Sequence, residues 1–415
     1  MRMLVSVRPA RLALLLGLLL CSAATWPALA ATPPDAPPAL HARSAILLEA
    51  ATGTVLFETN ADEPIPPASL TKLMTLHLAL NAVEAGSLDL AEEIVPGRDA
   101  WARNQPPHSS LMFLGPDQRL TVEQLLEGLV VVSGNDAAVA VADRVAGSVS
   151  AFVALMNEEA ARQGYASMHF AEPAGLSPRN VVTAREYAEF CRTFLQMHPD
   201  ALRTFFSLRS FTYPLPENLT NGTRQDPITQ PTRDTLLGRY AGLDGLKTGF
   251  IDESGYNMAA TAERDGMRLI AVVLGVRDAR GVSGETLRER DVSAVLDYGF
   301  STFVTLAPAW TNPVPVHVWK GRQRTLLPVA QTVPRVAVRR ADAARVTTTV
   351  TEQTEVIAPV HAGQVLGEVS VLLAGKQIAQ FPLTVADGVP RGGPLRRLWD
   401  TVALFVRRLL GVSTV

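Results

Sequence analysis

The sequence predicts an α/β fold in which helices pack on a mainly antiparallel sheet, followed by a small all-β sandwich domain and a C-terminal amphipathic helix. Three observations support this prediction. Strand-like segments flank a region of helical patterns, short β-branched segments dominate after residue 307, and residues 395–410 separate apolar from arginine side chains around a helix. With 415 residues, 47% hydrophobic and 19% charged, the chain can bury a large core in two domains. A net charge of −2 gives no sign of nucleic-acid binding.

Residues 1–30 are typical of a secretory signal peptide. Three arginines precede the apolar run 12–20, and Ala28-Leu29-Ala30 is a small-x-small cleavage site. An uncleaved anchor is the alternative. Residues 31–42 are expected to form a proline-rich, flexible leader. Removal of the signal leaves Cys191 as the only cysteine, so we expect no intramolecular disulfide.

The first folded domain is expected over residues 43–306. A strand at 44–49, a turn at Gly53 and a returning strand at 55–57 open it. Segments 255–262 and 269–275 are predicted to be two buried strands of a hairpin, and a last helix is expected at about 285–298.

The first chemical motif is Ser69-Leu70-Thr71-Lys72, at the start of a predicted helix that Gly86 ends. Residues three apart share one helix face, so the Ser69 hydroxyl and the Lys72 amine can meet. A serine becomes a nucleophile when a base takes its proton, and lysine is a base only if burial or a nearby cation lowers its pKa. The chain has only four lysines, whereas its many arginines cannot act as bases. The pair alone is also compatible with a surface helix.

The second motif, Ser133-Gly134-Asn135, follows an apolar run at 125–132 that is predicted to be a buried helix. A second hydroxyl near Ser69 could relay a proton, and the Asn135 amide could bind a substrate amide. Taken alone, the motif is more typical of a turn that ends a helix than of a catalytic site.

The third motif is Lys247-Thr248-Gly249. Lys247 could supply positive charge for a carboxylate and help to lower the pKa of Lys72. Because Gly249 has no side chain, a substrate backbone could lie against this stretch as an added strand. A glycine-rich strand end with an exposed lysine is the alternative interpretation.

Residues 307–388 alternate short β-branched segments with turns rich in Gly and Pro, which predicts the β-sandwich domain. Residues 389–415 then contain a helix-breaking segment rich in Pro and Gly, followed by the amphipathic helix. The arginine-rich side of this helix lies opposite a face with Trp399 and Phe405, which is typical of a helix in a membrane interface. The run is too short and too charged to span a membrane. Packing of this helix on the β domain is the alternative.

In this order, the three motifs resemble those of the low-molecular-mass penicillin-binding D-alanyl-D-alanine carboxypeptidases, within the serine penicillin-recognising group that includes class A β-lactamases. The residues around each motif, at 67–72, 133–137 and 244–249, also match the sequence pattern of that family. So does Gly255-Tyr256-Asn257, which follows the third motif. The wider group has Ser-Asp-Asn where this chain has Gly134, and Ser-Gly-Asn is typical of the carboxypeptidases. The resemblance covers about residues 43–410 and implies a serine transpeptidase/β-lactamase-like fold with a stalk domain.

Residue by residue, the resemblance implies that Ser69 is the acylated nucleophile, Lys72 its base and Ser133 the proton relay to the leaving group. The implied substrate-binding residues are Asn135, Arg233, Lys247, Thr248 and Gly249. Arg233 matches a family arginine that helps to hold the terminal carboxylate of the substrate. Residues 232–237 nevertheless depart from the asparagine-rich sequence that is usual in the family at this place. The implied oxyanion hole consists of the backbone N–H groups of Ser69 and Phe250; relatives often have histidine at the second position.

The implied reaction is removal of the terminal D-alanine from a peptidoglycan pentapeptide ending in D-Ala-D-Ala, on the periplasmic face of the bacterial cytoplasmic membrane. β-Lactam antibiotics would acylate the same serine. A β-lactamase is one alternative, but the residues around Glu172 and Glu186 do not match the motif expected around the acidic residue that deacylates such enzymes. A wall-binding scaffold without catalysis is the other.

No metal or other cofactor is expected. None of the seven histidines forms a metal-ligand pair at short helical spacing. His77, on the predicted nucleophile helix, is expected to be a packed or solvated residue and not a catalyst.

Overall fold

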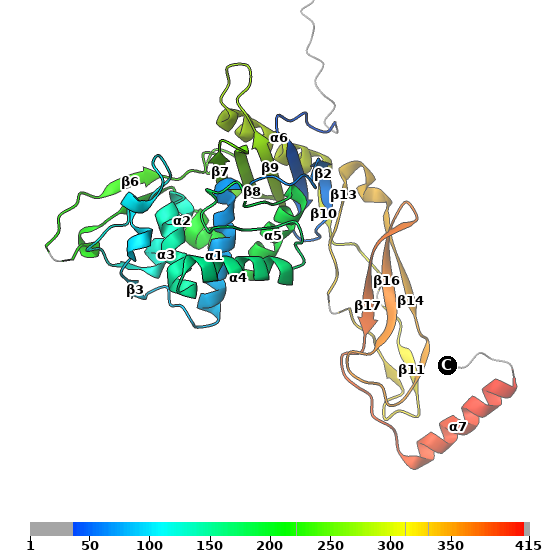
Figure 1. The fold of residues 1–415 in the computed structure, drawn as a ribbon. Coiled ribbons are helices and arrows are strands. Elements are labelled where there is room, and N and C mark those ends of the chain that lie inside the picture. Colours follow the sequence, from blue (N-terminus) through cyan, green and yellow to red (C-terminus); the bar gives the residue numbers. More distant parts are fainter. Residues whose placement is uncertain (1–35, 221, 312, 331, 411–415) are drawn as a thin grey trace, which may run out of the picture.

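The computed structural model describes residues 36–220, 222–311, 313–330 and 332–410 (Figure 1). The predicted signal peptide and the first residues of the predicted leader lie outside the described residues. The described chain forms a large α/β domain, an elongated all-β domain beside it, and a separate C-terminal helix.

A five-stranded antiparallel sheet forms the centre of the first domain, with strand order β2-β1-β9-β8-β7. Its strands are β1 Ser44–Glu49, β2 Val55–Thr59, β7 Leu243–Ile251, β8 Gly255–Arg264 and β9 Met267–Val276. The predicted strands at the two ends of the domain, β1 and β9, therefore lie side by side, and β7 is left as a free edge of the sheet.

Both faces of this sheet are covered, which explains why β9 is almost continuously apolar in sequence. Along β9, Ile270 and Val272 belong to one buried cluster, whereas Leu269 and Ala271 belong to the other. The side chains alternate because successive residues of a strand point to opposite faces. Helix α6, Gly284–Thr302, packs on the second face, and the remaining helices of the domain lie on the first (Figure 1).

The helices of the first face pack around α1, which follows the Ser69 turn. Their bounds are α1 Lys72–Glu84, α2 Val122–Val131, α3 Asn135–Ala146, α4 Val149–Arg162 and α5 Ala184–Met197. Helix α2 begins with a capping box, in which the Thr121 hydroxyl accepts from the Gln124 amide and the Gln124 side chain accepts from Thr121. The shorter strand pairs of this domain are β3 Glu93–Ile94 with β4 Leu120–Thr121, and β5 Ser210–Tyr213 with β6 Ile228–Pro231.

The second domain is all β, as the sequence predicts. One of its sheets has the order β14-β16-β17 and another the order β12-β11-β15. The strands are β11 Val316–Trp319, β12 Thr325–Leu326, β14 Val346–Glu352, β15 Glu355–Ile357, β16 Val365–Leu373 and β17 Lys376–Thr384. Strand β10, Phe303–Leu306, pairs with β13, Val336–Arg339, so the chain joins this domain one strand before the boundary expected at 306.

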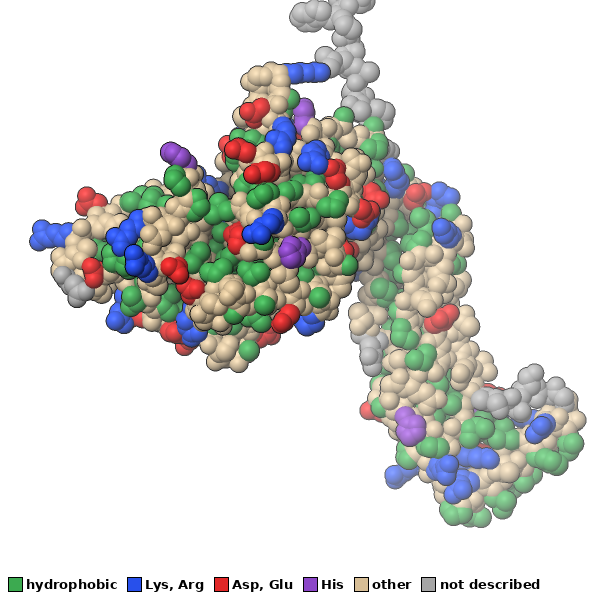
Figure 2. All heavy atoms as spheres, in the orientation of Figure 1, with side chains coloured by type: hydrophobic (Ala, Val, Ile, Leu, Met, Phe, Trp, Pro, Cys, Tyr) green, Lys and Arg blue, Asp and Glu red, His purple; other side chains and the backbone are tan. Residues whose placement is uncertain are grey.

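Helix α7, Pro394–Leu409, contacts the second domain through its polar side. The backbone amide of Lys320 donates to the Asp400 carboxylate at 2.6 Å, and Arg407 forms an ion pair of 2.6 Å with Glu355. The apolar side faces away from the protein, with Leu395 79% exposed and Trp399 74% exposed. Figure 2 shows the apolar side chains gathered along this helix. In these described residues, the helix does not bury its apolar face on the β domain.

Within the described residues, no single helix has the length and apolar character needed to cross a membrane, although the pair α3 and α4, bent by 83°, meets that test by length and composition alone.

Candidate active site

Ser69 lies in a short 3₁₀ turn, Ala68–Thr71, that precedes α1, and not inside one continuous helix as the sequence predicts. Ala68 has a left-handed backbone, with φ of 53°, a conformation that costs free energy in a residue with a Cβ. The turn is held by its neighbours. The Asn257 side chain on β8 donates to the Pro66 carbonyl at 3.0 Å, and the Tyr187 hydroxyl donates to the Leu70 carbonyl at 2.7 Å.

Gly249 is required by the close approach of β7 to this turn. A Cβ at Gly249 would lie 2.9 Å from both the Pro67 carbonyl oxygen and the Ser69 nitrogen, which is closer than real Cβ atoms come. The missing side chain therefore makes room for the turn that carries Ser69, in addition to any peptide backbone that lies along β7.

Lys72 is 1% exposed, and its amine contacts three oxygens. Nζ lies 3.0 Å from Ser69 Oγ, 2.7 Å from Asn135 Oδ1 and 2.5 Å from the Ala174 carbonyl oxygen. Two of these oxygens, those of Asn135 and Ala174, can only accept hydrogen bonds. A neutral amine that donates to both keeps its lone pair for the proton of the Ser69 hydroxyl. The arrangement is that of a serine nucleophile with its base.

Burial lowers the pKa of Lys72 from 10.5 to about 7, while the negative charges of Glu172 and Asp136 oppose this shift. The main cause is loss of water around the ammonium, and not a neighbouring cation. A substantial fraction of Lys72 is therefore neutral at physiological pH, which a general base requires.

This pKa predicts the pH dependence of acylation. Below about pH 7 the Lys72 amine is protonated and has no lone pair, so the rate constant for acylation of Ser69 should rise about tenfold per pH unit and level off above that pH. Stopped-flow measurement of acylation from about pH 5 to about pH 9 tests this. A rate that does not change across this range would contradict the assignment of Lys72 as the base.

The second motif lies directly across from Lys72. Because Asn135 Oδ1 is held by Lys72, its amide N–H groups are left for a ligand. Ser133 is 3% exposed, has φ of 61°, and its hydroxyl has no hydrogen-bond partner within the described structure. Both residues line a cavity of about 400 Å³ that also contains Ser69. Within the described structure, the Ser133 hydroxyl is not hydrogen-bonded to Ser69 or Lys72.

Asp136, which follows the second motif, organises the wall of this cavity. Its buried carboxylate accepts from the backbone amides of Met112, Phe113, Leu114 and Ala137, at 2.8 to 3.0 Å. A Cβ at Gly134 would lie 2.8 Å from Asp136 Oδ1. Glycine at the centre of the second motif therefore accommodates the Asp136 carboxylate, an explanation that only the folded arrangement provides.

Lys247 and Thr248 lie on opposite faces of β7. Lys247 is 3% exposed and donates to the Thr248 carbonyl at 3.1 Å. Burial, and then the charge of Lys72, lower the pKa of Lys247 well below its usual range, while the nearby Asp234 carboxylate opposes the shift. The Thr248 hydroxyl donates to the Arg233 carbonyl at 3.4 Å.

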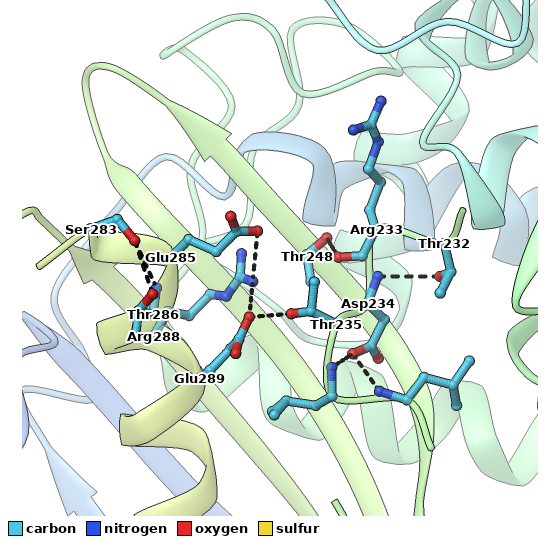
Figure 3. Close-up of polar contacts among 12 residues, drawn as sticks. Thr232, Arg233, Asp234, Thr235, Thr248, Ser283, Glu285, Thr286, Arg288 and Glu289 are labelled. Carbon is cyan, nitrogen blue, oxygen red and sulfur yellow. Dashed lines mark hydrogen bonds and ion pairs between the residues drawn. The ribbon is translucent and has the colours of Figure 1, made fainter. Parts of the chain in front are cut away.

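The cationic residues near Thr248 come from two elements. Arg233 is exposed, and Figure 3 shows its side chain pointing away from Thr248, so its backbone rather than its guanidinium contacts that residue. Arg288, on α6, projects toward Thr248 (Figure 3); it is 2% exposed and its Nε has no partner in the described structure. Both line the cavity. No local sequence pattern pointed to Arg288, because it lies on a separate helix outside the three motifs.

Phe250 follows Gly249 on β7, and its side chain is 48% exposed at the cavity. Its ring packs against Tyr256 on β8, with centroids 4.4 Å apart and the ring planes inclined at 39°. The Ser69 nitrogen and this end of β7 lie close together, as the contact at Gly249 shows.

The two acidic residues considered for a β-lactamase mechanism have structural contacts. Glu172 accepts from the backbone amides of Ala174 and Gly175, at 2.8 and 2.7 Å, and so shapes the loop whose Ala174 carbonyl contacts Lys72. Glu186 accepts from the backbone amide of Ser167 at 2.9 Å. Neither lines the cavity.

His77 is fully buried behind the nucleophile. Its ring nitrogens lie 2.9 Å from His198 Nε2 and 2.9 Å from Glu159 Oε1, so it is a packed residue of α1. In the part of the chain that the structure describes, no group of three or more His, Cys, Asp or Glu side chains is arranged to hold a metal ion.

Known proteins share this sequence and fold. A family model described as D-alanyl-D-alanine carboxypeptidase matches residues 30–278, and one described as the C-terminal domain of penicillin-binding protein 5 matches residues 305–391. D-alanyl-D-alanine carboxypeptidase DacC of Escherichia coli K12 is 35% identical over 385 residues, 90% of each chain, and DacA of the same organism is 34% identical over 385 residues with the same coverage. The structure of penicillin-binding protein 5 from Haemophilus influenzae aligns with a TM-score of 0.74 at 31% identity, covering 86% of this chain and 99% of that chain.

Proposed function

The chain belongs to the D-alanyl-D-alanine carboxypeptidase family, and from that premise we propose that Ser69 carries the acyl group with Lys72 as its base. The protein is a serine-type D-Ala-D-Ala carboxypeptidase, a peptidase of the penicillin-binding protein group. The contact that best supports the assignment of the two residues is the Lys72 amine, 3.0 Å from Ser69 Oγ and held by two acceptor oxygens.

In the first step, Ser69 Oγ attacks the carbonyl carbon between the last two D-alanines while its proton passes to Lys72 Nζ. The backbone N–H groups of Ser69 and Phe250 stabilise the oxyanion that forms. Ser133 then gives its proton to the leaving amine and takes in return the proton held by Lys72 Nζ, so that the C–N bond breaks, D-alanine departs and Lys72 is neutral again. The unpartnered Ser133 hydroxyl in the cavity supports this relay. Water hydrolyses the acyl-enzyme in the second step.

We assign binding of the substrate to the groups around these three residues. The free N–H groups of Asn135 bind the substrate amide, and the peptide lies along the open edge of β7 beside Gly249. The terminal carboxylate binds near the Thr248 hydroxyl, within the positive field of Arg233 and Arg288. The buried Lys247 amine, whose pKa is lowered, lies behind Thr248 on the same strand. Arg288 adds to the set expected from sequence.

β-Lactamase activity is disfavoured by the contacts of Glu172 and Glu186, which bind backbone amides outside the cavity. Incubation of the purified protein with penicillin and, in parallel, with a peptide ending in D-Ala-D-Ala tests the function. We expect a lasting penicillin adduct in the intact mass and release of D-alanine. Rapid turnover of penicillin without D-alanine release would instead indicate a β-lactamase, and the absence of both reactions a scaffold.

The C-terminal helix α7 is proposed to attach the exported protein to the outer surface of the cytoplasmic membrane, with the β domain as a stalk. The exposed apolar side of α7, opposite the arginines, supports this location. The contacts of Asp400 and Arg407 with the β domain hold the apolar side outward.

Deletion of residues 391–415 is therefore expected to release the mature protein from membranes. Sedimentation of membrane fractions measures this directly. In the full chain, Trp399→Glu with Phe405→Glu should have the same effect, because charged side chains disfavour burial among lipid tails. Thr401→Glu, on the polar side, is the control and should stay bound. Continued sedimentation of the truncated protein with membranes would contradict the proposal.

A further inference from the structure

The substrate groove along β7 changes its charge from one end to the other. At the level of Thr248 it is positive, because Arg233 and Arg288 line it. Past Phe250 it is lined by the carboxyl groups of Asp252 and Glu253, in the turn between β7 and β8, and of Glu285, in the first turn of α6. Figure 3 shows Glu285 and Arg288 projecting from α6 toward this strand, one helical turn apart.

An aromatic surface lies at the acidic end of the groove. The Phe250 and Tyr256 rings pack together with centroids 4.4 Å apart and planes inclined at 39°, and Phe250 remains 48% exposed. Helix α6 begins against the Tyr256 ring, since a Cβ at Gly284 would lie 2.5 Å from its Cδ2. Asp278, Glu285 and Asp252 are close enough to this ring to raise the pKa of the Tyr256 hydroxyl, after the larger effect of burial. Aromatic faces and carboxylates together are the groups that proteins use to bind ammonium ions.

The turn at the acidic end of the groove is held by hydrogen bonds to its backbone and not to its carboxylates. Arg277 donates to the backbone carbonyls of Asp252 at 3.0 Å and Glu253 at 2.6 Å, which positions their turn. In the described structure, neither of these two carboxylates forms an ion pair, and Glu285 is paired only with Arg288, at 3.4 Å. The Ser133 hydroxyl in the same cavity is also buried and without a partner in the described structure, as is expected in a groove that accepts a polar ligand.

The direction of the bound peptide follows from the proposed function, on which this inference rests. With the terminal carboxylate near Thr248 and the scissile carbonyl at Ser69, the acyl part continues along β7 past Phe250. Each residue of an extended chain advances about 3.3 Å. The residue before D-Ala-D-Ala therefore lies beside the end of β7, where a long side chain reaches the Asp252–Glu253 turn.

We propose that Phe250, Tyr256, Asp252, Glu253 and Glu285 form an ammonium-binding end of the substrate groove. Its ligand is the free side-chain amine of a diamino acid that precedes D-Ala-D-Ala in the stem peptide. The enzyme then prefers stem peptides with a free side-chain amine over peptides in which that amine is acylated, as it is in a cross-link. A charge-polarised groove matches a peptide with a carboxylate at one end and an ammonium at the other.

Three peptides test the inference: Nα-acetyl-L-Lys-D-Ala-D-Ala, its Nε-acetylated form, and the peptide with norleucine in place of lysine. We expect kcat/KM for D-alanine release to be about five- to tenfold higher for the free amine than for either neutral peptide, mainly through KM. The preference should fall as salt is added, because the carboxylates are exposed. Equal or faster cleavage of the norleucine peptide would overturn the inference.

Substitutions test whether Asp252 and Glu253 cause the preference for the peptide with a free amine. Asp252→Asn combined with Glu253→Gln should bring the ratio of kcat/KM for the lysine and norleucine peptides close to one. Glu84→Gln removes a charge at the far end of α1 and should leave that ratio at its wild-type value. An unchanged ratio in the Asp252/Glu253 variant would contradict the assigned site. Failure of all three peptides to release D-alanine would contradict the proposed function itself, and with it this inference.

Discussion

Ser69→Ala is expected to abolish both D-alanine release and the penicillin adduct. The Oγ that forms the acyl bond is absent in this variant, and Lys72 alone has no group to activate. Removal of a serine nucleophile typically lowers kcat by about 10⁴-fold or more. The intact mass of the protein after incubation with penicillin shows the adduct, and a D-alanine assay measures turnover.

Ser87→Ala is the matched control for this loss. Its hydroxyl donates to the Ala82 carbonyl near the far end of α1, outside the cavity. This variant should form the adduct at the wild-type rate. An adduct of unchanged mass and yield in Ser69→Ala would place the nucleophile elsewhere, with Ser133 as the next hydroxyl to test.

Lys72→Arg is expected to lower the rate of acylation by about 10³-fold or more, within the range that a positioned base contributes. Arginine keeps the positive charge but stays protonated, so it cannot accept the Ser69 proton. Its larger head must also fit where the Lys72 amine already contacts three oxygens. The acylation rate constant with penicillin measures the effect, and the rise with pH through about 7 should disappear.

A second variant separates chemistry from misfolding. Lys72→Met has a similar volume and no charge, and it should show the same loss of acylation while thermal unfolding reports whether the fold is kept. Lys320→Arg, in the β domain, is the control for lysine-to-arginine replacement. Wild-type acylation in both Lys72 variants would exclude this residue as the base.

Patterns of short range predicted most of the fold correctly. The apolar runs at 255–262 and 269–275 form β8 and β9, because a strand buried on both faces needs a continuous apolar sequence. The arginine and apolar residues of 395–410 form α7 for a similarly local reason, the helical period. The helix predicted to start at Ser69 begins instead at Lys72, because contacts from β8 and α5 hold Ser69 in the preceding turn.

In the site, too, short-range patterns predicted only those features that do not depend on contacts between distant segments. The spacing of Ser69 and Lys72 predicted that their side chains can meet, and they lie 3.0 Å apart. The explanation for Gly134, which makes room for the Asp136 carboxylate, could not be read from its neighbours in sequence. Arg288 was missed entirely, since its position beside Thr248 depends on the packing of α6 against the sheet.

By itself, the sequence determined the chemistry that the chain carries: a serine with a lysine one helical turn away, two further polar motifs, and the periods of its strands and helices. The tertiary structure alone decided how these groups act together. Burial lowers the pKa of Lys72 to about 7, and two acceptor oxygens, from Asn135 and Ala174, orient its amine toward Ser69. Those effects depend on desolvation and on contacts between distant segments, which arise only when the chain packs.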